Sequence, residues 1–299
     1  MDAKSMLSRI GFVGAGRVAQ TLAGAFSGAG YPVVAVSSRS AANLADFRAR
    51  CPAAQVMETP QEAADKSTIV FLTVSDDAIA PVCAGVRWRP GCAVVHCSGA
   101  TEVAALAAAA DAGAWVGGFH PMQMFANPDV ALAGLPGCTV GIEAQGPLLE
   151  ALRQLAQAIG CVPFSLPAGV RPLYHASAYY VGPFLIALLK EGAELWARFG
   201  ATERQAMEAM LPLLRGTVAA AMDGGLARGM GGCVARGDIG TIRKHLDALE
   251  SIDLAMANLY RELAVRNIPL AVQRGTLPPS RAAEIAALLQ GAPAQEPAA

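Results

Sequence analysis

The sequence has few charged side chains and no run of lysines or arginines. Charged residues make up 16% of the 299 residues, and the formal net charge is −1 with a pI near 6.4. Because nucleic-acid-binding proteins present clustered basic charge, we expect no nucleic-acid partner. No apolar stretch of about 18 residues is free of charges or glycine breaks, so we also expect no membrane span and no membrane partner.

Cysteines in metal-binding or disulfide spacing are missing as well. The seven cysteines are scattered, none forms a C-x-x-C pair, and most lie in apolar runs. An odd number of cysteines in such surroundings is typical of reduced, buried thiols. We therefore expect a cytoplasmic protein without a metal site. The alternative, a metal held by His96, Cys97 and His120, is weak because their spacing matches no familiar ligand set.

A glycine motif near the N-terminus lies between a strand and a helix. Gly14, Gly16 and Ala19 have the G-x-G-x-x-G/A spacing, and apolar strands are predicted on either side at 10–13 and 33–36. Gly14 permits a tight turn, Gly16 lets the backbone approach a pyrophosphate, and the helix N-terminus offers unpaired N–H groups. The motif predicts a dinucleotide site. The alternative is an ordinary βαβ unit without a ligand.

The second strand ends without an acidic residue, in Ser37, Ser38 and Arg39. An acid there would accept hydrogen bonds from the ribose of NAD and repel a 2′-phosphate, whereas two hydroxyls and a guanidinium suit that phosphate. We predict NADP(H) in preference to NAD(H), with Ser38 and Arg39 on the phosphate. The alternative is that Arg39 stacks on the adenine or is solvated. The predicted cofactor-binding residues are Gly14, Ala15, Gly16, Arg17, Val18, Ser37, Ser38, Arg39, Val74, Ser75 and Ser98.

Strands and helices alternate through the first half of the chain. This alternation predicts an α/β N-terminal Rossmann domain with a doubly wound, mainly parallel sheet over residues 1–166. Further strands are predicted at 55–57, 68–74, 93–96, 115–119, 139–142 and 161–165, with helices at 41–50, 60–65, 76–86 and 147–159. Ligands on such sheets bind beyond the carboxyl ends of the strands. The polar clusters at 14–17, 37–39, 75–77, 97–99 and 120–123 all fall at predicted ends.

The second half of the chain has a helical pattern throughout. We predict one long helix over 172–199, and further helices at 202–223, 238–249, 252–266 and 280–290. Residues 167–290 are thus expected to form an all-α domain. The small, proline-rich residues 291–299 are expected to form a disordered tail.

The catalytic candidates come from two polar clusters. His120 follows the strand at 115–119, where substrate is expected. Arg171, Tyr174 and His175 begin the long helix, and their i, i+3, i+4 spacing places them on one face. We predict a catalytic role for all four residues. For either histidine alone, a buried structural hydrogen bond is an even alternative.

Five residues are predicted to bind substrate. Ser98 follows the strand at 93–96 and would hold substrate or nicotinamide, and Arg236 lies in a glycine-rich loop where it would pair with a substrate carboxylate. Asp238 has the alternative of simply capping the next helix. The predicted set is Ser98, Gln123, Arg236, Asp238 and Thr241.

Several of these motifs together resemble a known family, the bacterial Rossmann-like proteins whose C-terminal domain has no known function. Those proteins are similar to pyrroline-5-carboxylate reductase and the β-hydroxyacid dehydrogenases. The resemblance implies a C-terminal domain of 6-phosphogluconate-dehydrogenase type, a homodimer formed through it, and an active site between the domains. The motifs that carry it are Gly14–Gly16, Ser98–Ala100, Phe119–Gln123, Arg171–Ala176, and Ala235–Asp238 with Thr241 and His245.

The start of the long helix departs from the pattern of the β-hydroxyacid dehydrogenases. There a Lys-x-x-Asn-Asn motif begins the equivalent helix, and its lysine is the general acid or base. In this chain Arg171 takes the lysine position, and Tyr174 and His175 take the asparagine positions. Arginine is always protonated and is a poor proton shuttle, whereas an imidazole with an ordinary pKa of about 6.5 suits that task. Family members often carry Asn where this chain has Pro183.

We therefore predict an NADP(H)-dependent oxidoreductase that transfers a hydride to or from a small carbonyl, hydroxy-acid or imine substrate. One alternative is a sensor or regulatory protein that binds NADP(H) without turnover. Another is a hydrolase that uses Ser98 or Cys97, but the sequence contains no G-x-S-x-G motif.

Overall fold

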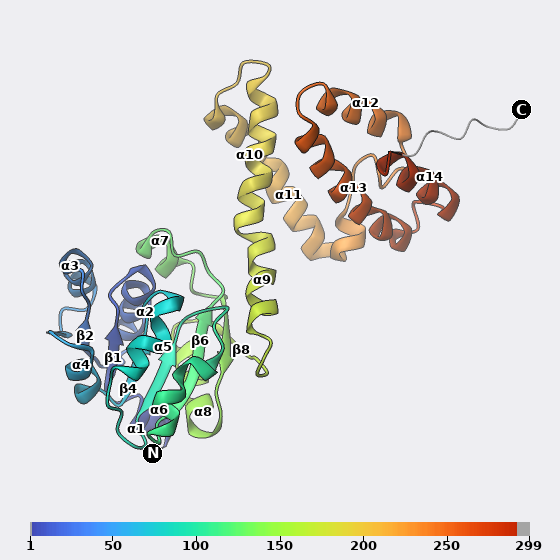
Figure 1. Ribbon diagram of the computed structural model, residues 1–299. Coiled ribbons are helices and arrows are strands. Elements are labelled where there is room, and N and C mark those ends of the chain that lie inside the picture. The colour runs from blue at the N-terminus through green and yellow to red at the C-terminus, as the bar shows by residue number, and fades with distance from the viewer. Residues whose placement is uncertain (1, 292–299) are drawn as a thin grey trace, which may run out of the picture. The chain divides into compact units, whose positions relative to one another are not determined.

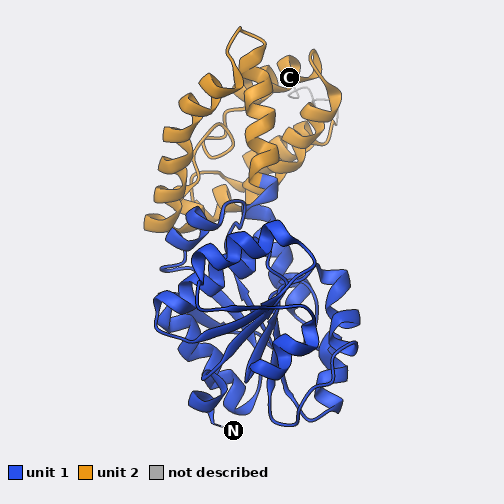
Figure 2. Cartoon of the chain, turned by 90° about the vertical axis from the view of Figure 1, so that its left-hand side faces the viewer, with its two compact units in different colours: residues 1–184 blue, residues 185–299 orange. Residues whose placement is uncertain are grey.

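The computed structural model describes residues 2–291 of the chain. The predicted tail, apart from Gly291, lies outside these residues. Two compact units, Met1–Phe184 and Leu185–Ala299, divide the chain (Figure 2). The first unit thus extends past the predicted boundary at 166/167 and includes helix α9 (Arg171–Val181).

The first unit contains, within residues 2–291, an eight-stranded sheet in the order β3-β2-β1-β4-β5-β6-β7-β8 (Figure 1). All neighbouring strands are parallel except β6 and β7. The predicted doubly wound, mainly parallel sheet is therefore confirmed. The strands are β1 (Ile10–Val13), β2 (Val33–Ser37), β3 (Gln55–Met57), β4 (Ile69–Leu72), β5 (Ala93–His96), β6 (Trp115–Pro121), β7 (Thr139–Glu143) and β8 (Val162–Ser165).

Alternating side chains of the central strands build two separate cores, one on each face of the sheet. Phe12 of β1 and Phe71 of β4 belong to one core, whereas Val13 and Leu72 belong to the other. Successive side chains of a strand point to opposite faces, so a fully apolar strand must be covered on both sides. The first face is covered by α1 (Ala3–Met6), α2 (Arg17–Gly28), α3 (Ala41–Arg50) and α8 (Gly146–Ala158). The second face is covered by α4 (Pro60–Lys66), α5 (Asp76–Ala84), the 3₁₀ turn η1 (Val103–Leu106) and α6 (Ala107–Asp111).

Five buried phenylalanines join the strands to the helices of the first face. The rings of Phe12 and Phe71 stack with their centroids 5.4 Å apart, and Phe26 of α2 lies 5.4 Å from Phe71. Phe47 of α3 and Phe119 of β6 contact this group edge-on. Such contacts fix the distance between α2 and the sheet, and α2 carries the glycine motif at its N-terminus.

Three short helices were not predicted: α1, α6 and a helix between β6 and β7. Helix α7 (Pro128–Ala133) follows β6 and packs against α2. Its Asp129 forms a 2.6 Å ion pair with Arg50, and its Pro128 carbonyl accepts a 3.4 Å hydrogen bond from Thr21. The segment between β6 and β7 is therefore held against the N-terminal half of the sheet.

Strand β8 forms one edge of the sheet. The N–H groups of Val162 and Leu166 donate to carbonyl oxygens of the β7 side at 2.9 and 2.7 Å. Val162 and Phe164 are 55% and 58% exposed. Pro163 lies between them.

The prediction of one continuous helix over 172–199 was wrong. The structure has α9 and α10 (Pro183–Ala197), separated at Gly182, which has φ −104° and ψ −95°. Pro183 lacks an N–H group, and its ring disfavours a helical conformation in the preceding residue. A proline in this position therefore ends the first helix one residue earlier.

The second unit is helical in its described residues, as predicted. It contains most of α10, followed by α11 (Glu203–Gly229), α12 (Ile239–Glu250), α13 (Leu254–Arg274) and α14 (Pro279–Leu289). Helix α11 is longer than predicted and has a kink at Gly225, where φ is +76°. Ile242, Ala264 and Ile285 lie in the core formed by the last three helices. Among residues 2–291, no helix combines the length and apolar character needed to cross a bilayer.

Replacing Phe71 with alanine should lower the free energy of unfolding by about 3–5 kcal/mol, because a large cavity is left among the phenylalanine rings. Phe164→Ala is the matched control, since that side chain is largely exposed and its loss should cost less than about 1 kcal/mol. Urea unfolding followed by circular dichroism measures both changes. If both variants lost the same free energy of unfolding, Phe71 would not be a core residue of the sheet.

Candidate functional site

A cavity of about 760 Å³ lies at the carboxyl ends of β1, β2 and β4. Because these strands are parallel neighbours, the residues that follow them meet at one edge of the sheet. Eight of the predicted cofactor-binding residues line this cavity, and Arg17, Val18 and Ser98 do not. The eight are Gly14, Ala15, Gly16, Ser37, Ser38, Arg39, Val74 and Ser75.

The two glycines of the motif have different geometry. Gly14 has φ +99°, and a Cβ atom on it would lie 2.5 Å from the carbonyl oxygen of Thr73. Gly16 is the N-cap of α2, and no side chain caps that helix. A Cβ atom on Gly16 would meet no atom within 4 Å, so the first-turn N–H groups border open space. This arrangement suits an anionic group such as a pyrophosphate.

The end of β2 presents hydroxyl and guanidinium groups to the same cavity. Ser37 is buried, Ser38 Oγ accepts a 3.2 Å hydrogen bond from the N–H of Ser40, and Arg39 is exposed. The first acidic residue on this wall is Glu58, which follows β3. The chemistry at the strand end therefore fits a phosphate ester better than free ribose hydroxyls.

Three side chains from the first turns of α9 lie over glycines of the sheet region, as their predicted common face requires. A Cβ atom on each glycine would lie less than 3.0 Å from the side chain above it. Only glycine leaves room for the helix to approach so closely. Arg171 lies over Gly118 of β6, Tyr174 over Gly141 of β7, and His175 over Gly99 after β5.

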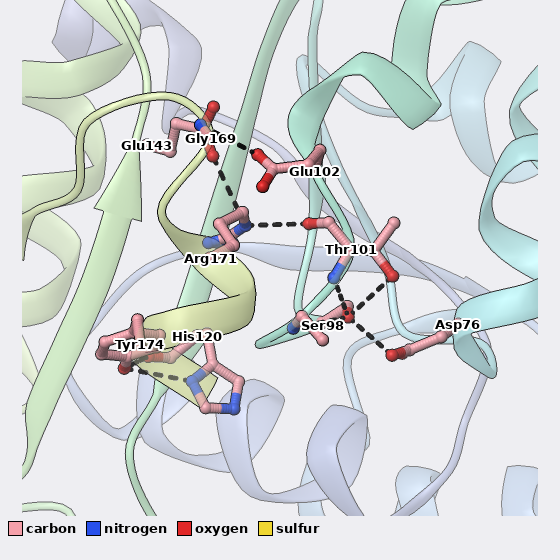
Figure 3. Close-up of polar contacts among 10 residues, drawn as sticks. Asp76, Ser98, Thr101, Glu102, His120, Glu143, Gly169, Arg171 and Tyr174 are labelled. Carbon is pink, nitrogen blue, oxygen red and sulfur yellow. Dashed lines mark hydrogen bonds and ion pairs between the residues drawn. The ribbon is translucent and has the colours of Figure 1, made fainter. Parts of the chain in front are cut away.

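His120, Tyr174 and His175 form a contiguous group. The Tyr174 hydroxyl lies 3.1 Å from both Nδ1 and the carbonyl oxygen of His120, and the two imidazole centroids are 5.7 Å apart (Figure 3 shows the first two residues). Burial, with smaller effects from His175 and Arg171, lowers the pKa of His120 to about 4. Burial raises the pKa of Tyr174 to about 12. At pH 7 both are therefore neutral, and the tyrosine can donate a hydrogen bond.

Ser98 shapes the loop that follows β5. Its hydroxyl donates to Asp76 Oδ2 at 2.8 Å and accepts from the N–H of Thr101 at 3.0 Å, with Thr101 Oγ1 a further 2.9 Å contact (Figure 3). The side chain is buried. These bonds engage the hydroxyl within the protein, and its contact with substrate or nicotinamide stays a prediction.

Arg171 is completely buried. Its Nε donates to the Thr101 carbonyl at 2.9 Å and lies 3.4 Å from Glu143 Oε2 (Figure 3). Within the described residues, neither Nη atom has a hydrogen-bond partner. The guanidinium is therefore directed at the protein interior.

His96, the last residue of β5, is also completely buried, and neither ring nitrogen has a hydrogen-bond partner within residues 2–291. Burial, then the charge of Arg171 and His120, lowers its pKa to about 3. The imidazole is thus neutral over the whole physiological range.

Two residues that were predicted to bind substrate or cofactor form hydrogen bonds with the loop after β6. Gln123 Nε2 donates to the Gly134 carbonyl at 2.9 Å, and its Oε1 accepts from the N–H of Met124 at 2.8 Å. Arg17, at the start of α2, donates to the Ala126 carbonyl at 3.2 Å. Both side chains thus order the segment that leads from His120 to α7.

The remaining predicted substrate residues belong to the helical unit. Arg236 and Thr241 line a cavity of about 490 Å³ together with His245 and Tyr260, whose hydroxyl lies 3.0 Å from His245 Nδ1. Asp238 caps α12, because it accepts from the N–H and the hydroxyl of Thr241 at 3.0 and 2.7 Å. The capping role that the sequence left open is therefore the one observed.

Several site residues were not identified from the sequence. Asp76 and Thr101 hold the Ser98 loop, and the S-x-x-T spacing of Ser98 and Thr101 is a signal that could have indicated the turn. Glu143 had no such signal, because its place beside Arg171 depends on the antiparallel register of β7. Asn43 lines the cavity because α3 begins just after β2 ends, and Glu58 because it follows β3, which pairs with β2.

Within the described residues, no group of three or more histidine, cysteine or acidic side chains is arranged to hold a metal ion. All seven cysteines are free. Cys97 is half-buried. Its partial removal from water raises the pKa of its thiol to about 12, so the thiol is a poor nucleophile.

Folding stability should decrease as the pH falls from 7 to 4, because His96 and His120 stay neutral in the folded protein. Histidine in an unfolded chain has a pKa of about 6.5, so the unfolded state takes up protons first. Each histidine then contributes a loss of up to about 1.4 kcal/mol per pH unit below that value. Urea unfolding at several pH values should show a flatter dependence for His96→Leu than for the wild type. Parallel curves would contradict the burial of a neutral imidazole.

Two family models match the sequence. Residues 2–121 match a Rossmann-like domain, and residues 138–267 match a domain of unknown function, DUF2520. A comparison with curated proteins found no match.

Solved structures show a similar fold. A protein of Bacteroides fragilis described as an NADP oxidoreductase has a TM-score of 0.72 at 22% identity, over 87% of this chain and 97% of that chain. A pyrroline-5-carboxylate reductase from Coxiella burnetii has a TM-score of 0.57 at 16% identity, over 94% and 98%. A reductive aminase from Aspergillus terreus, in complex with NADPH and ethyl-5-oxohexanoate, has a TM-score of 0.59 at 16% identity, over 95% and 93%. With both domain matches and this fold, the chain belongs to the Rossmann-like proteins that carry a DUF2520 domain.

Proposed function

We propose that this protein is an NADP(H)-dependent oxidoreductase that acts on a small carbonyl, hydroxy-acid or imine substrate. One observation carries the proposal. The glycine turn at Gly14 and Gly16 follows β1, and the group of His120 and His175 lies at the ends of β5 and β6. The carboxyl ends of these parallel strands face the same edge of one sheet, within one compact unit. The proposed dinucleotide site and the proposed proton-transfer group therefore lie at the same edge of the sheet.

The cofactor assignment rests on the end of β2. Ser38 and Arg39 would hold the 2′-phosphate, and the open first turn of α2 would hold the pyrophosphate. The similarity to a Bacteroides fragilis protein described as an NADP oxidoreductase, and to a reductive aminase that binds NADPH, supports the same choice.

The chain's own residues would supply the proton chemistry. A bound NADPH provides a hydride, so reduction of a C=O or C=N group also needs one proton. His175 is the proposed proton donor. The neutral His120 lies beside His175, and the neutral hydroxyl of Tyr174 contacts His120, so these two residues can orient the His175 imidazole or relay a proton to it. Oxidation would run the same transfers in reverse.

The finer assignments are also proposals. Arg236, Asp238 and Thr241 of the helical unit would contribute to substrate binding, with Arg236 suited to a carboxylate. Homodimerisation through that unit is supported by large exposed apolar side chains on α11, Leu213 and Met222 among them. A cytoplasmic location stays a prediction.

Replacing Arg39 with alanine should weaken NADPH binding by roughly 10- to 100-fold, because a charge-assisted contact to the phosphate is lost. Binding of NADH should stay the same, since it has no 2′-phosphate. Fluorescence titration with each nucleotide measures both constants. Arg48→Ala is the matched control, because Arg48 is exposed on α3 away from the cavity. An unchanged NADPH affinity for Arg39→Ala would refute this assignment.

Turnover is tested by following NADPH oxidation with a panel of keto acids, aldehydes and cyclic imines. His175→Asn should reduce kcat by about 10²- to 10⁴-fold while NADPH binding persists, as expected for a lost proton donor. Tyr180→Phe, an exposed position of the same helix, is the control and should retain full activity. If the wild type binds NADPH tightly but oxidises none of it across the panel, the protein is a nucleotide sensor and the proposed enzyme activity is wrong.

A further inference from the structure

A chain of contacts connects the start of α9 to the wall of the cofactor cavity. Arg171 donates to the Thr101 carbonyl, the Thr101 N–H donates to Ser98 Oγ, and Ser98 donates to Asp76 (Figure 3). Asp76 is the first residue of α5, and its neighbours Ser75 and Asp77 line the cavity. Each bond in this chain is 2.8–3.0 Å long.

Stability alone does not explain the guanidinium at position 171. Arg171 is the first residue of α9, where the positive end of the helix dipole disfavours a cation. The charge is buried, its nearest carboxylate lies 3.4 Å away, and both Nη atoms are without partners in the described residues. Apolar residues of similar volume often replace such buried charges at no cost in stability.

The same residue belongs to the helix that carries Tyr174 and His175. Arg171 lies over Gly118, and one turn later Tyr174 and His175 lie over Gly141 and Gly99. Because the three residues lie within the first turns of one hydrogen-bonded helix, a displacement of the helix at Arg171 would move all three contacts together. Gly99 belongs to the loop whose Thr101 carbonyl accepts the bond from Arg171.

We propose that Arg171 is a positioning residue. Through the chain of contacts with Thr101, Ser98 and Asp76, it holds His175 and Tyr174 at a fixed position relative to the cofactor cavity. It does not touch substrate, because its guanidinium is buried beneath α9. Its effect on turnover rests on the function proposed above. Its effect on the geometry of the two histidines does not.

The decisive variant is Arg171→Met, which removes the Nε–H donor and keeps much of the side-chain volume. We expect kcat to fall about 100-fold, as for a displaced catalytic group, while NADPH affinity stays the same and Tm changes by less than roughly 5 °C. Arg171→Lys, which retains a donor and the charge, should recover part of the lost kcat. Arg153→Met is the control, since Arg153 is an exposed residue of α8 that contacts only Ser165 among the hydrogen bonds found.

NMR of the imidazole groups gives a readout that does not depend on turnover. Arg171→Met should shift the signals of His120 and His175, and it should raise the pKa of His120 because a nearby positive charge is lost. The other groups that face His120 are His96 from β5 and Tyr174 and His175 from α9, and all are retained in the variant. Unchanged histidine signals in Arg171→Met would overturn the proposal.

A second variant, Ser98→Ala, breaks the same chain at another point. Because both changes interrupt one connection, the double variant should be about as slow as the slower single variant. Fully multiplicative losses would overturn the proposal. If Arg171→Met fails to fold, Ser98→Ala decides alone by NMR, a readout that does not depend on a contact between Ser98 and substrate. Shifted imidazole signals of His175 support the chain of contacts, and unchanged signals refute it. A wild type without turnover would refute the proposed function, and the NMR comparison would still decide the role of Arg171.

Discussion

Parallel pairing of the central strands is the constraint on which the candidate site depends. Strands β1, β2, β4, β5 and β6 all run in one direction, so the residues that follow each of them gather at a single edge. Parallel strands need crossover connections, and these bury both faces of the sheet. Because the parallel arrangement requires both faces to be buried, the glycines, hydroxyls and histidines can lie together at this edge only if the two apolar cores form.

A second constraint acts perpendicular to the sheet. The first turns of α9 contact β6, β7 and the loop after β5, and glycines 118, 141 and 99 make that approach possible. The helix is held there partly by a buried cation in an unfavourable position, at Arg171. Proteins retain such arrangements where geometry matters more than stability. His175, which lies one turn after Arg171 in the same helix, is the residue that this geometry positions.

The sequence predicted the α/β and all-helical halves because both signals are local. Apolar strands such as Ile69–Leu72 and the spacing of Gly14 and Gly16 need no knowledge of distant residues. The common face of Arg171 and His175 also followed from helical spacing. What the sequence did not reveal depends on contacts between distant segments: the burial of Arg171, and the place of Glu143, which is set by the one antiparallel register. The break at Gly182 was missed because an apolar pattern continues across Pro183.

The edge of the sheet at β8 has a consequence for the behaviour of the protein in solution. Since the N–H groups of Val162 and Leu166 point toward β7, the backbone nitrogen of Pro163 points toward the open side. A proline has no hydrogen there to offer an incoming strand. The exposed Val162 and Phe164 would otherwise make this edge a template for association between molecules. Pro163 thus hinders the pairing of this apolar edge strand with a strand of another molecule, which is the contact that would lead to aggregation at high protein concentration.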